Sequence, residues 1–424
     1  MKKGLIRNLP LAMLMAGVLM GCQGQTGAEE SVGVVQGDSN EALDLDKKVS
    51  LTLWGAGEDA ELLAELVESF KQEYAKEADF EITIVDQGEA DCKEALFGDI
   101  EGGADVFAFA DDQLRAMVAA GALSPVENAD AVKKANIEAA GEAASVNGRL
   151  YAYPMTADNG YFLYYNKEYL GDADVKELDT ILQIAAENEK KVTMDWSSGW
   201  YLYSFFGCTG LEVGLNDDGV SNFCNWNAVD TPVKGTDVAS AMLEIAANPG
   251  FSNCVDADFI KGVQDGSVIA GISGVWDAVA IEQAWGNNYE AAKLPTYTCA
   301  GNQIQMASFA GYKMLGVNAY SKNVKWSHKL AEWITNEENQ TLRFSRRGQG
   351  PSNINASSSL EVQNSPAIQA VLEQSEFASL QRIGGTYWSP VQAFGETMAA
   401  GNPQGKALQE LLDTMVEAVT QSYN

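Results

Sequence analysis

Two extended segments meet at a break within residues 147–167, and this stretch constrains the fold more than any other part of the chain. The segment LYAY at 150–153 is strand-like, but Pro154 lacks the N–H that a central strand needs, so an uninterrupted ladder cannot run through it. DNG at 158–160 favours a turn, after which YFLYY at 161–165 is extended again. Two interpretations remain: a bulged edge strand inside one sheet, or a strand that leaves one body of the protein and enters another.

The size and charge of the chain limit its class and its partners. A length of 424 residues exceeds what one hydrophobic core holds, while 46% hydrophobic residues are enough for two or three domains. The chain has 28 Lys and Arg against 59 Asp and Glu, a net charge of −31. Because this charge repels phosphate groups, it excludes nucleic acid and an anionic membrane surface as direct partners.

The N-terminus has the pattern of an export signal. A basic opening, MKKGLIR, is followed by an apolar run at 9–20 that is too short to span a membrane comfortably. The run ends in LMGC at 19–22, which resembles a bacterial lipobox, with Met20 in place of the usual small residue. We therefore predict a lipoprotein signal peptide at 1–21 and a lipid on Cys22, the first residue after cleavage.

Residues 22–46 are acidic, contain Gly and Ser and have no aromatic residue, which predicts a flexible tether. The alternative at the N-terminus is an uncleaved anchor helix in which Cys22 is incidental. With a cleaved signal, the protein is extracytoplasmic and is held at the outer face of the bacterial cell membrane. It then touches the membrane through its N-terminal lipid only.

The other cysteines and the single histidine argue against a metal site and against nucleophilic catalysis. Of the six cysteines, five remain after Cys22, and none forms a CxxC pair, so the spacing typical of metal ligands is absent. Cys208 and Cys224 flank a Gly/Asp/Asn-rich segment and are either a disulfide or two reduced thiols. His328 lies in an amphipathic helix pattern and is interpreted as structural, which leaves no imidazole for a catalytic triad. We expect neither a metal nor a cofactor.

Strands and helices alternate along the rest of the chain. A strand at 49–54, a helix at 58–76 and a strand at 80–85 predict a βαβ unit, which implies parallel pairing. GAG at 55–57 lacks the third glycine of a dinucleotide fingerprint and is interpreted as a tight turn. Later helices are expected at 90–100, 112–120, 175–189, 237–247, 322–336, 337–345 and 406–422, and later strands at 104–110, 191–195 and 268–272. The fold class is α/β.

Aromatic and acidic residues gather at the ends of the predicted strands and in the loops that follow them. The rings are Trp54, Phe109, Trp196, Trp200, Trp276 and Trp388, and the polar residues at similar edges are Glu58, Asp59, Asp111, Asp112, Asp158 and Gln392. In open α/β sheets, ligands bind outside the carboxyl ends of the strands. A pyranose suits such a site, because its C–H groups lie against an aromatic face and its hydroxyls need fixed acceptors. For Asp111 and Asp112 the alternative is a helix N-cap with an acidic first turn.

Six blocks of the sequence resemble, in order, the maltose/maltodextrin-binding proteins of ABC importers. They are LTLWG (51–55), ADVFAFADD (104–112), NGRLYAYP (147–154), LYYNKE (163–168), GISGVW (271–276) and LPT (294–296). The resemblance implies a two-lobed, type II periplasmic-binding-protein-like fold in which strands cross between mainly parallel, helix-flanked sheets. It places the N-terminal lobe at 47–156 and 302–352 and the C-terminal lobe at 157–301 and 353–424, with the first crossing near Pro154.

The resemblance also implies roles for individual residues. The family's stacking rings fall on Phe109, Trp200, Trp276 and Trp388, and its polar sugar contacts on Glu58, Asp59, Asp112, Gln113 and Asp158. Several family residues are absent: a Lys near Asp59, an Arg where Gln113 stands, another where Gln392 stands, and a Glu-Pro pair before Trp200. The expected aromatic framework is therefore kept while the polar rim differs, which leaves the linkage, length and branching of the glucan open.

The function that follows from the resemblance is capture of malto-oligosaccharides by a monomeric, lipid-anchored solute-binding protein that delivers them to the membrane subunits of an ABC permease. It is a binder and not an enzyme. Alternatives are a binder of another oligosaccharide or of a cationic solute such as a polyamine, since indoles and carboxylates also cage ammonium groups. A secreted glycoside hydrolase with Glu58 and Asp112 as its carboxylate pair, and a surface adhesin, are the remaining classes.

Overall fold

The structure of the protein is a computed structural model that describes residues 48–216 and 218–421. The predicted signal peptide, the tether and Cys22 lie outside the described residues. The described residues belong to one compact unit. Within the part of the chain that the structure describes, none of the helices combines the length and the apolar character needed to cross a membrane.

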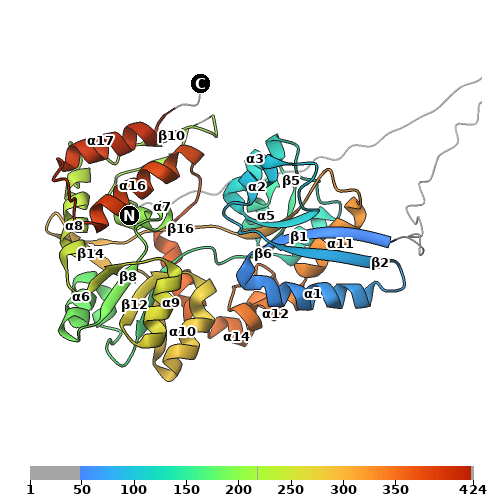
Figure 1. Ribbon diagram of the computed structural model, residues 1–424, viewed down its shortest axis with the longest axis horizontal. Coiled ribbons are helices and arrows are strands. Elements are labelled where there is room, and N and C mark those ends of the chain that lie inside the picture. Colours follow the sequence, from blue (N-terminus) through green and yellow to red (C-terminus); the bar gives the residue numbers. More distant parts are fainter. Residues whose placement is uncertain (1–47, 217, 422–424) are drawn as a thin grey trace, which may run out of the picture. The chain divides into compact units, whose positions relative to one another are not determined.

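The first sheet is built around the predicted βαβ unit. β1 (Lys48–Gly55) and β2 (Asp79–Asp86) pair in parallel, and α1 (Ala60–Glu73) runs alongside them (Figure 1). In β1, Val49, Leu51 and Leu53 are buried and alternate with more exposed residues, as expected of a strand with one face on a core. The strand order is β2-β1-β3-β17-β6, in which the other strands are β3 (Val106–Ala110), β17 (Lys313–Val317) and β6 (Ala152–Thr156).

The second sheet has the strand order β11-β8-β12-β7-β13. Its strands are β11 (Phe251–Asn253), β8 (Lys191–Met194), β12 (Val268–Ser273), β7 (Phe162–Asn166) and β13 (Tyr289–Ala292). In β7, Leu163 and Tyr165 join one hydrophobic cluster while Phe162 and Tyr164 join another. Because successive side chains point to opposite faces, this burial on both faces explains the unbroken run of large hydrophobic residues.

The stretch around Pro154 is both an edge strand of the first sheet and a crossing to the second sheet. β6 is an edge strand of the first sheet, and its register against β17 shifts beside Pro154, where a missing N–H costs no ladder hydrogen bond. The chain then enters the second sheet as β7. The prediction that a strand leaves one body for another is therefore confirmed, while the exact bounds of the two lobes stay a prediction.

The prediction of mainly parallel sheets is wrong in its detail. In each five-stranded sheet two neighbouring pairs are parallel and two are antiparallel. β17 and β7 account for the antiparallel pairs, because each follows a segment that arrives from the other sheet rather than a helical crossover.

Two more segments help to join the sheets. β16 (Ser308–Ala310) precedes β17 and pairs in parallel with β18 (Ala378–Leu380). Shorter antiparallel ribbons are β4 (Ser145–Val146) with β5 (Arg149–Leu150), β9 (Val213–Leu215) with β10 (Asn222–Cys224), and β14 (Thr296–Cys299) with β15 (Asn302–Gln305).

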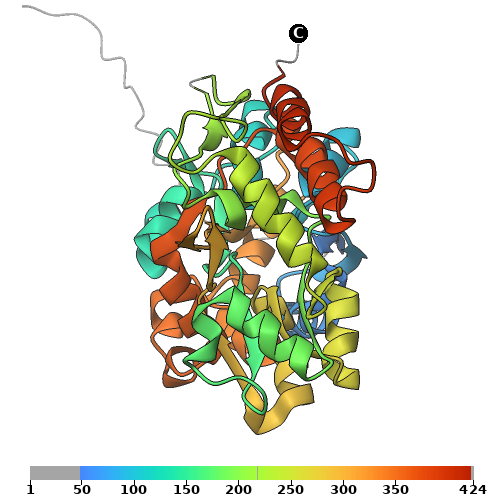
Figure 2. The same cartoon turned by 90° about the vertical axis from the view of Figure 1, so that its left-hand side faces the viewer.

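Helices cover both sheets. Those of the first sheet and its surroundings include α2 (Cys92–Gly98), α3 (Leu114–Ala119), α4 (Ala129–Ala135), α5 (Glu138–Ala143), α11 (Val324–Ile334), α12 (Glu337–Arg347), α13 (Ile354–Ser357) and α14 (Leu360–Gln363). Those of the second include α6 (Leu178–Glu187), α7 (Gly199–Phe206), α8 (Gly235–Ala247), α9 (Asp256–Asp265), α10 (Ala278–Trp285), α15 (Pro366–Gln374), α16 (Trp388–Ala399) and α17 (Leu408–Val419). α16 and α17 pack on each other and on α8 (Figure 2).

Short 3-10 turns follow several strands and begin several helices. They are η1 (Gly57–Asp59), η2 (Asp111–Gln113), η3 (Asp174–Lys176), η4 (Val275–Asp277), η5 (Gly286–Asn288), η6 (Ser375–Phe377) and η7 (Gly385–Tyr387). Three of them, η1, η2 and η4, stand directly after β1, β3 and β12, at the strand ends where the sequence predicts a ligand.

His328 and the cysteines have structural surroundings. The His328 ring lies 2.9 Å from Ser124 Oγ and 3.0 Å from the Tyr153 hydroxyl, and burial lowers the pKa of the imidazole. The structural interpretation of His328 is confirmed. Cys208 and Cys224 are free thiols, as are Cys92, Cys254 and Cys299. Of the two alternatives for Cys208 and Cys224, the structure therefore has the reduced thiols and not the disulfide.

Candidate functional site: a cavity between the two sheets

A cavity of about 640 Å³ lies at the carboxyl ends of strands from both sheets. Glu58 and Asp112 follow β1 and β3 of the first sheet, while Asp195 and Trp276 follow β8 and β12 of the second. Its lining residues are Glu58, Glu89, Ala90, Asp91, Lys93, Glu94, Ala110, Asp112, Gln113, Asn159, Asp195, Ser197, Ser198, Gly199, Trp200, Tyr201, Asp256, Trp276, Lys313, Gln381, Trp388 and Gln392. The location agrees with the rule that ligands of open α/β sheets bind beyond the strand ends.

Three half-buried indoles form one wall of the cavity. The rings of Trp200 and Trp276 lie 5.6 Å apart with an interplanar angle of 37°. Trp276 Nε1 donates to Asp256 Oδ2 at 3.2 Å, and Gly274 passes so close that a Cβ there would lie 2.0 Å from the indole, so only glycine fits. Trp388 begins α16 and meets the ring of Tyr387 edge-on, with centroids 5.0 Å apart. This wall offers aromatic faces to a ligand.

Local structure explains how Trp200 reaches the cavity. Ser198 is the N-cap of α7, and its hydroxyl accepts from the Trp200 backbone N–H at 3.3 Å. The helix therefore starts one residue before Trp200, which places the indole at the helix end rather than in the middle of its buried face. The Trp200 Nε1 atom is buried without a hydrogen-bond partner. It is a donor that a bound ligand would satisfy.

Carboxylates stand around the indoles. Asp256 lies beside Asp195, and burial together with the charge of Asp195 raises the pKa of Asp256. Asp112 Oδ1 is buried without a partner, and burial followed by the charge of Asp111 raises the pKa of Asp112 to about 7. Such oxygens accept hydrogen bonds from hydroxyl or ammonium groups, so this rim suits either kind of ligand.

We expect Asp112→Asn to raise the melting temperature of the ligand-free protein clearly at pH 8 and less at pH 5. The folded-state pKa of about 7 lies above the ordinary value of 3.8, so stability falls as the pH rises from the unfolded pKa through the folded one. Above pH 7 the parent holds a buried charge beside Asp111, and the amide removes it. Thermal unfolding at both pH values measures the effect; equal shifts at pH 5 and pH 8 would contradict it.

Seven of the residues predicted from the sequence line this cavity: Glu58, Asp112, Gln113, Trp200, Trp276, Trp388 and Gln392. Gln113 differs from the others because its amide is already used. Its Oε1 accepts from Lys93 N at 2.8 Å, and its Nε2 donates to Glu89 O at 2.6 Å. We infer that Gln113 holds the 89–93 loop in place rather than offering free polar atoms to a ligand.

Two of the predicted polar contacts, Asp59 and Asp158, lie away from the cavity lining and are corrected. Asp59 is buried and accepts from Arg343 and, at 2.9 Å, from Arg347 Nε. Burial alone would raise its pKa, but the two guanidinium groups outweigh burial and lower it. Asp158 is buried and accepts from the Gly350 backbone N–H. Both carboxylates tie distant segments of the chain together.

Two of the predicted rings, Phe109 and Trp196, are core residues. Phe109 is fully buried in β3 and packs on Phe107 with centroids 5.9 Å apart. Trp196 is also fully buried, with its centroid 5.3 Å from that of Phe205 and 4.7 Å from that of Phe251. The expectation that these two rings stack on a ligand is therefore revised.

Several residues of the cavity were not predicted from the sequence. Asp195, Asp256 and Lys313 line it, together with Glu89, Asn159 and Gln381. Asp195 had a usable signal, because it is the last residue of the strand predicted at 191–195 and so stands at a strand end, as Trp196 does. Asp256 stands at the first position of α9, and its neighbour in space, Trp276, comes twenty residues later in the chain. No local pattern links the two.

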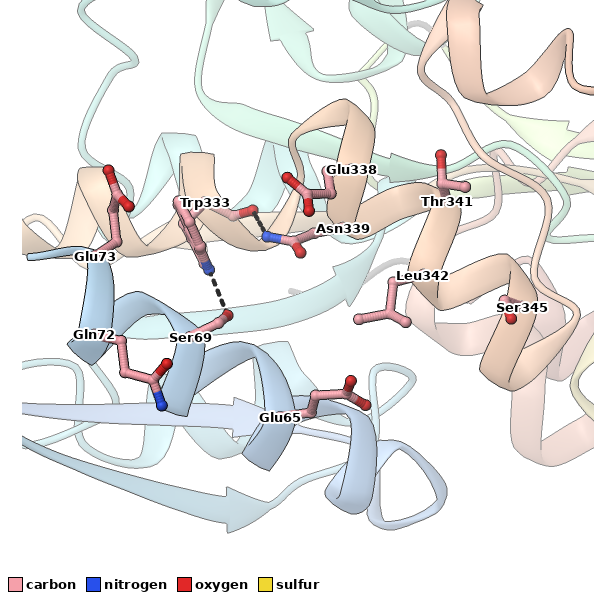
Figure 3. Close-up of a pocket in the computed structure, with 10 residues that line it drawn as sticks. All are labelled: Glu65, Ser69, Gln72, Glu73, Trp333, Glu338, Asn339, Thr341, Leu342 and Ser345. Atoms are coloured by element: carbon pink, nitrogen blue, oxygen red, sulfur yellow. Dashed lines mark hydrogen bonds between the residues drawn. The ribbon is translucent and has the colours of Figure 1, made fainter.

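A second hollow, of about 810 Å³, lies on the outside of the first sheet's helices. Figure 3 shows its lining residues, which come from α1, α11 and α12. Its one indole, Trp333, packs edge-on against Phe70 and donates Nε1 to Ser69 Oγ at 3.1 Å. Although this hollow is larger, it lies at no strand end and its ring is already engaged, so it lacks the features of a ligand cavity.

A cavity that two α/β sheets line together, with indoles on one wall and carboxylates around them, is the arrangement of a two-lobed solute-binding protein. The chain matches the family described as bacterial extracellular solute-binding protein over residues 65–370, and it belongs to that family.

Two named relatives share about a quarter of their residues with this chain. A galactooligosaccharide-binding protein of Bacillus subtilis (strain 168) is 26% identical over 402 residues, which cover 89% of this chain and 91% of the relative. A maltooligosaccharide ABC transporter solute-binding lipoprotein of Streptococcus pneumoniae (strain ATCC BAA-255 / R6) is 25% identical and covers 84% of this chain and 86% of the relative.

Solved structures share the fold. One described as being with acarbose has a TM-score of 0.79 and 29% identity, covering 88% of this chain and 99% of its own. The maltodextrin binding protein MalE1 from L. casei BL23, without ligand, has a TM-score of 0.72 and 25% identity, covering 89% of this chain and 100% of its own. These similarities confirm the predicted two-lobed fold.

Proposed function

We propose that this chain is the solute-binding protein of an ABC importer and that it captures malto-oligosaccharides outside the cytoplasm. The observation that carries the proposal is the cavity itself, in which Trp200, Trp276 and Trp388 face a rim of carboxylates and amides. Aromatic faces suit the C–H surfaces of glucose rings, and the rim suits their hydroxyls. The names of the relatives, which refer to oligosaccharides, support the same ligand class.

Binding would draw the two lobes together around the ligand. The indoles and Asp195 belong to the second sheet and its helices, whereas Glu58 and Asp112 belong to the first, so one ligand would contact both. Contacts made only in the closed state favour closure. A shift from 1:99 to 99:1 closed requires the ligand to bind the closed form about 10⁴-fold more tightly.

The experiment that tests the proposal is calorimetric titration of the purified protein with a panel of gluco-oligosaccharides that differ in length, linkage and branching. Saturable binding of one maltotriose per chain is expected, and the panel would then define the preferred glucan. Chromatography of the same mixtures looks for shorter sugars. Their release would favour the hydrolase alternative, in which Glu58 and Asp112 act as the carboxylate pair, over a binder.

A cationic solute is the second candidate, and the charge of the cavity favours it. Seven carboxylates line the cavity (Glu58, Glu89, Asp91, Glu94, Asp112, Asp195 and Asp256) against two ammonium groups (Lys93 and Lys313). Indoles next to carboxylates can hold an ammonium ligand. Binding that weakens strongly with added salt would favour this candidate over a neutral sugar.

For the N-terminus we propose that Cys22 is lipidated and holds the monomeric protein at the membrane, close to the permease. The relative from Streptococcus pneumoniae is named a lipoprotein, which supports this. Cys22→Ala is expected to release the protein from the membrane fraction into the medium, because one residue carries the anchor. Fractionation of cells followed by immunoblotting measures the release; an unchanged membrane fraction would contradict the lipid anchor.

A further inference from the structure

Lys313 is the one cation that links the two walls of the cavity among the described residues. It begins β17, directly after the segment that follows β16, and its side chain is only 12% exposed. Its ammonium lies 5.6 Å from the centre of the Trp276 ring, which belongs to the second sheet, and 3.6 Å from Glu89 Oε1, which belongs to the first-sheet side. The contact with Trp276 is a cation–π interaction.

The surroundings of Lys313 keep it charged. Burial by itself would lower the pKa of the ammonium, but the carboxylates of Glu89, Asp158 and Asp59 outweigh burial and raise it. The second cavity cation, Lys93, forms its ion pair with Glu94 at 2.9 Å, and 63% of the Glu94 side chain is exposed. Lys313 therefore supplies a permanent positive charge at the indole wall, whereas Lys93 pairs toward solvent.

The position of this charge decides which ligands the cavity accepts. Without Lys313, the Trp200 and Trp276 rings beside Asp195 and Asp256 would form a cage of the kind that binds ammonium groups. With Lys313, a cationic ligand meets a like charge on the face of Trp276, which is a repulsive element of the sort that creates specificity. A neutral hydroxyl group instead meets the N–H donors of the ammonium that do not point at Glu89.

We propose that Lys313 determines the ligand class of this cavity, favouring neutral, hydroxyl-rich oligosaccharides and rejecting amine-bearing solutes. This inference rests on the proposed capture of oligosaccharides. Lys313 would strengthen the binding of neutral oligosaccharides and weaken the binding of amine-bearing solutes. A residue that only supports the fold would affect both ligands in the same direction.

The test uses Lys313→Met, which keeps the length of the side chain and removes its charge. Calorimetric titration is carried out with maltotriose and, separately, with spermidine. We expect the affinity for maltotriose to fall at least about tenfold, because a charged donor is lost. We expect the affinity for spermidine to rise about fivefold or more, because the indoles and carboxylates are freed for it.

Two further variants keep the test decisive. Lys329→Met is the matched control, since Lys329 lies 5.0 Å from the Trp326 ring and 3.4 Å from Glu77 Oε2 but outside the cavity. It should leave both affinities unchanged. Lys313→Met leaves the Glu89 carboxylate without its ion-pair partner, which could unfold the single variant. The double variant Glu89→Gln with Lys313→Met removes that carboxylate as well, and its affinities for both ligands are also measured.

The outcomes separate this inference from the proposed function. A loss for maltotriose together with a gain for spermidine supports the role of Lys313. Unchanged maltotriose affinity, or a loss for maltotriose without a gain for spermidine, overturns it while oligosaccharide capture stands. If the parent protein binds spermidine and not maltotriose, the proposed function fails, and with it the role assigned to Lys313.

Discussion

Trp276→Ala is expected to lower the affinity for malto-oligosaccharides by roughly 30-fold or more, with little change in the unfolding midpoint of the ligand-free protein. The indole is only half-buried on the cavity wall beside Trp200, so part of its ring is open to a ligand, although the Lys313 ammonium lies over one face. Trp388→Ala should behave in the same way, because Trp388 also lines the cavity. Calorimetry and thermal unfolding of the same preparations measure both quantities.

The control for this prediction is Trp333→Ala, which removes an indole from the outer hollow rather than from the cavity. The fraction of that variant that is folded should bind malto-oligosaccharides as the parent does. The prediction for Trp276 and Trp388 would be wrong if their variants unfolded at much lower temperature yet bound as tightly as the parent while folded. In that case the two indoles would be core residues.

The opposite result is expected for Trp196→Ala. Trp196 is fully buried against Phe205 and Phe251, and truncating a buried Trp removes about 3–5 kcal/mol from the free energy of unfolding. Denaturant titration measures this loss. The affinity of the folded fraction should change far less than in Trp276→Ala, because the Trp196 ring does not line the cavity.

Trp226→Ala is the matched core variant. Trp226 is fully buried as well and stacks on Phe206 with centroids 4.0 Å apart, but it is not adjacent in sequence to any lining residue. A similar loss of stability in both variants, with ligand affinity kept, is the expected pattern. A 30-fold loss of affinity in Trp196→Ala but not in Trp226→Ala would return Trp196 to the ligand site.

The comparison of Trp196 with Trp200 explains how far the sequence could predict the site. Both follow the strand predicted at 191–195, and composition cannot tell a ring that turns inward from one that faces a ligand. The N-cap at Ser198 decides the matter, because it starts α7 so that Trp200 lies on the cavity wall while Trp196 stays in the core. Spacing along the chain predicted the loop but not the direction of each ring.

Residues whose partners are far away in sequence were the hardest to predict. Asp59 looks like a free carboxylate at a strand end, but its partner Arg343 stands 284 positions later. Lys313 is an ordinary residue at the start of a strand until the fold brings it to Trp276. By contrast, the βαβ unit depends on short-range periodicity and was predicted correctly. The crossing near Pro154 was one of two interpretations of the local sequence, and the resemblance to the family selected it.

The most direct test of oligosaccharide capture in this cavity is a crystal structure of the protein with maltotriose. We expect a sugar bound between the two sheets, with a glucose ring against Trp276 or Trp388 and with hydroxyls near Asp112, Asp256 and Lys313. A maltotriose seated in the outer hollow beside Trp333, or a cavity that stays empty at saturating maltotriose, would contradict it.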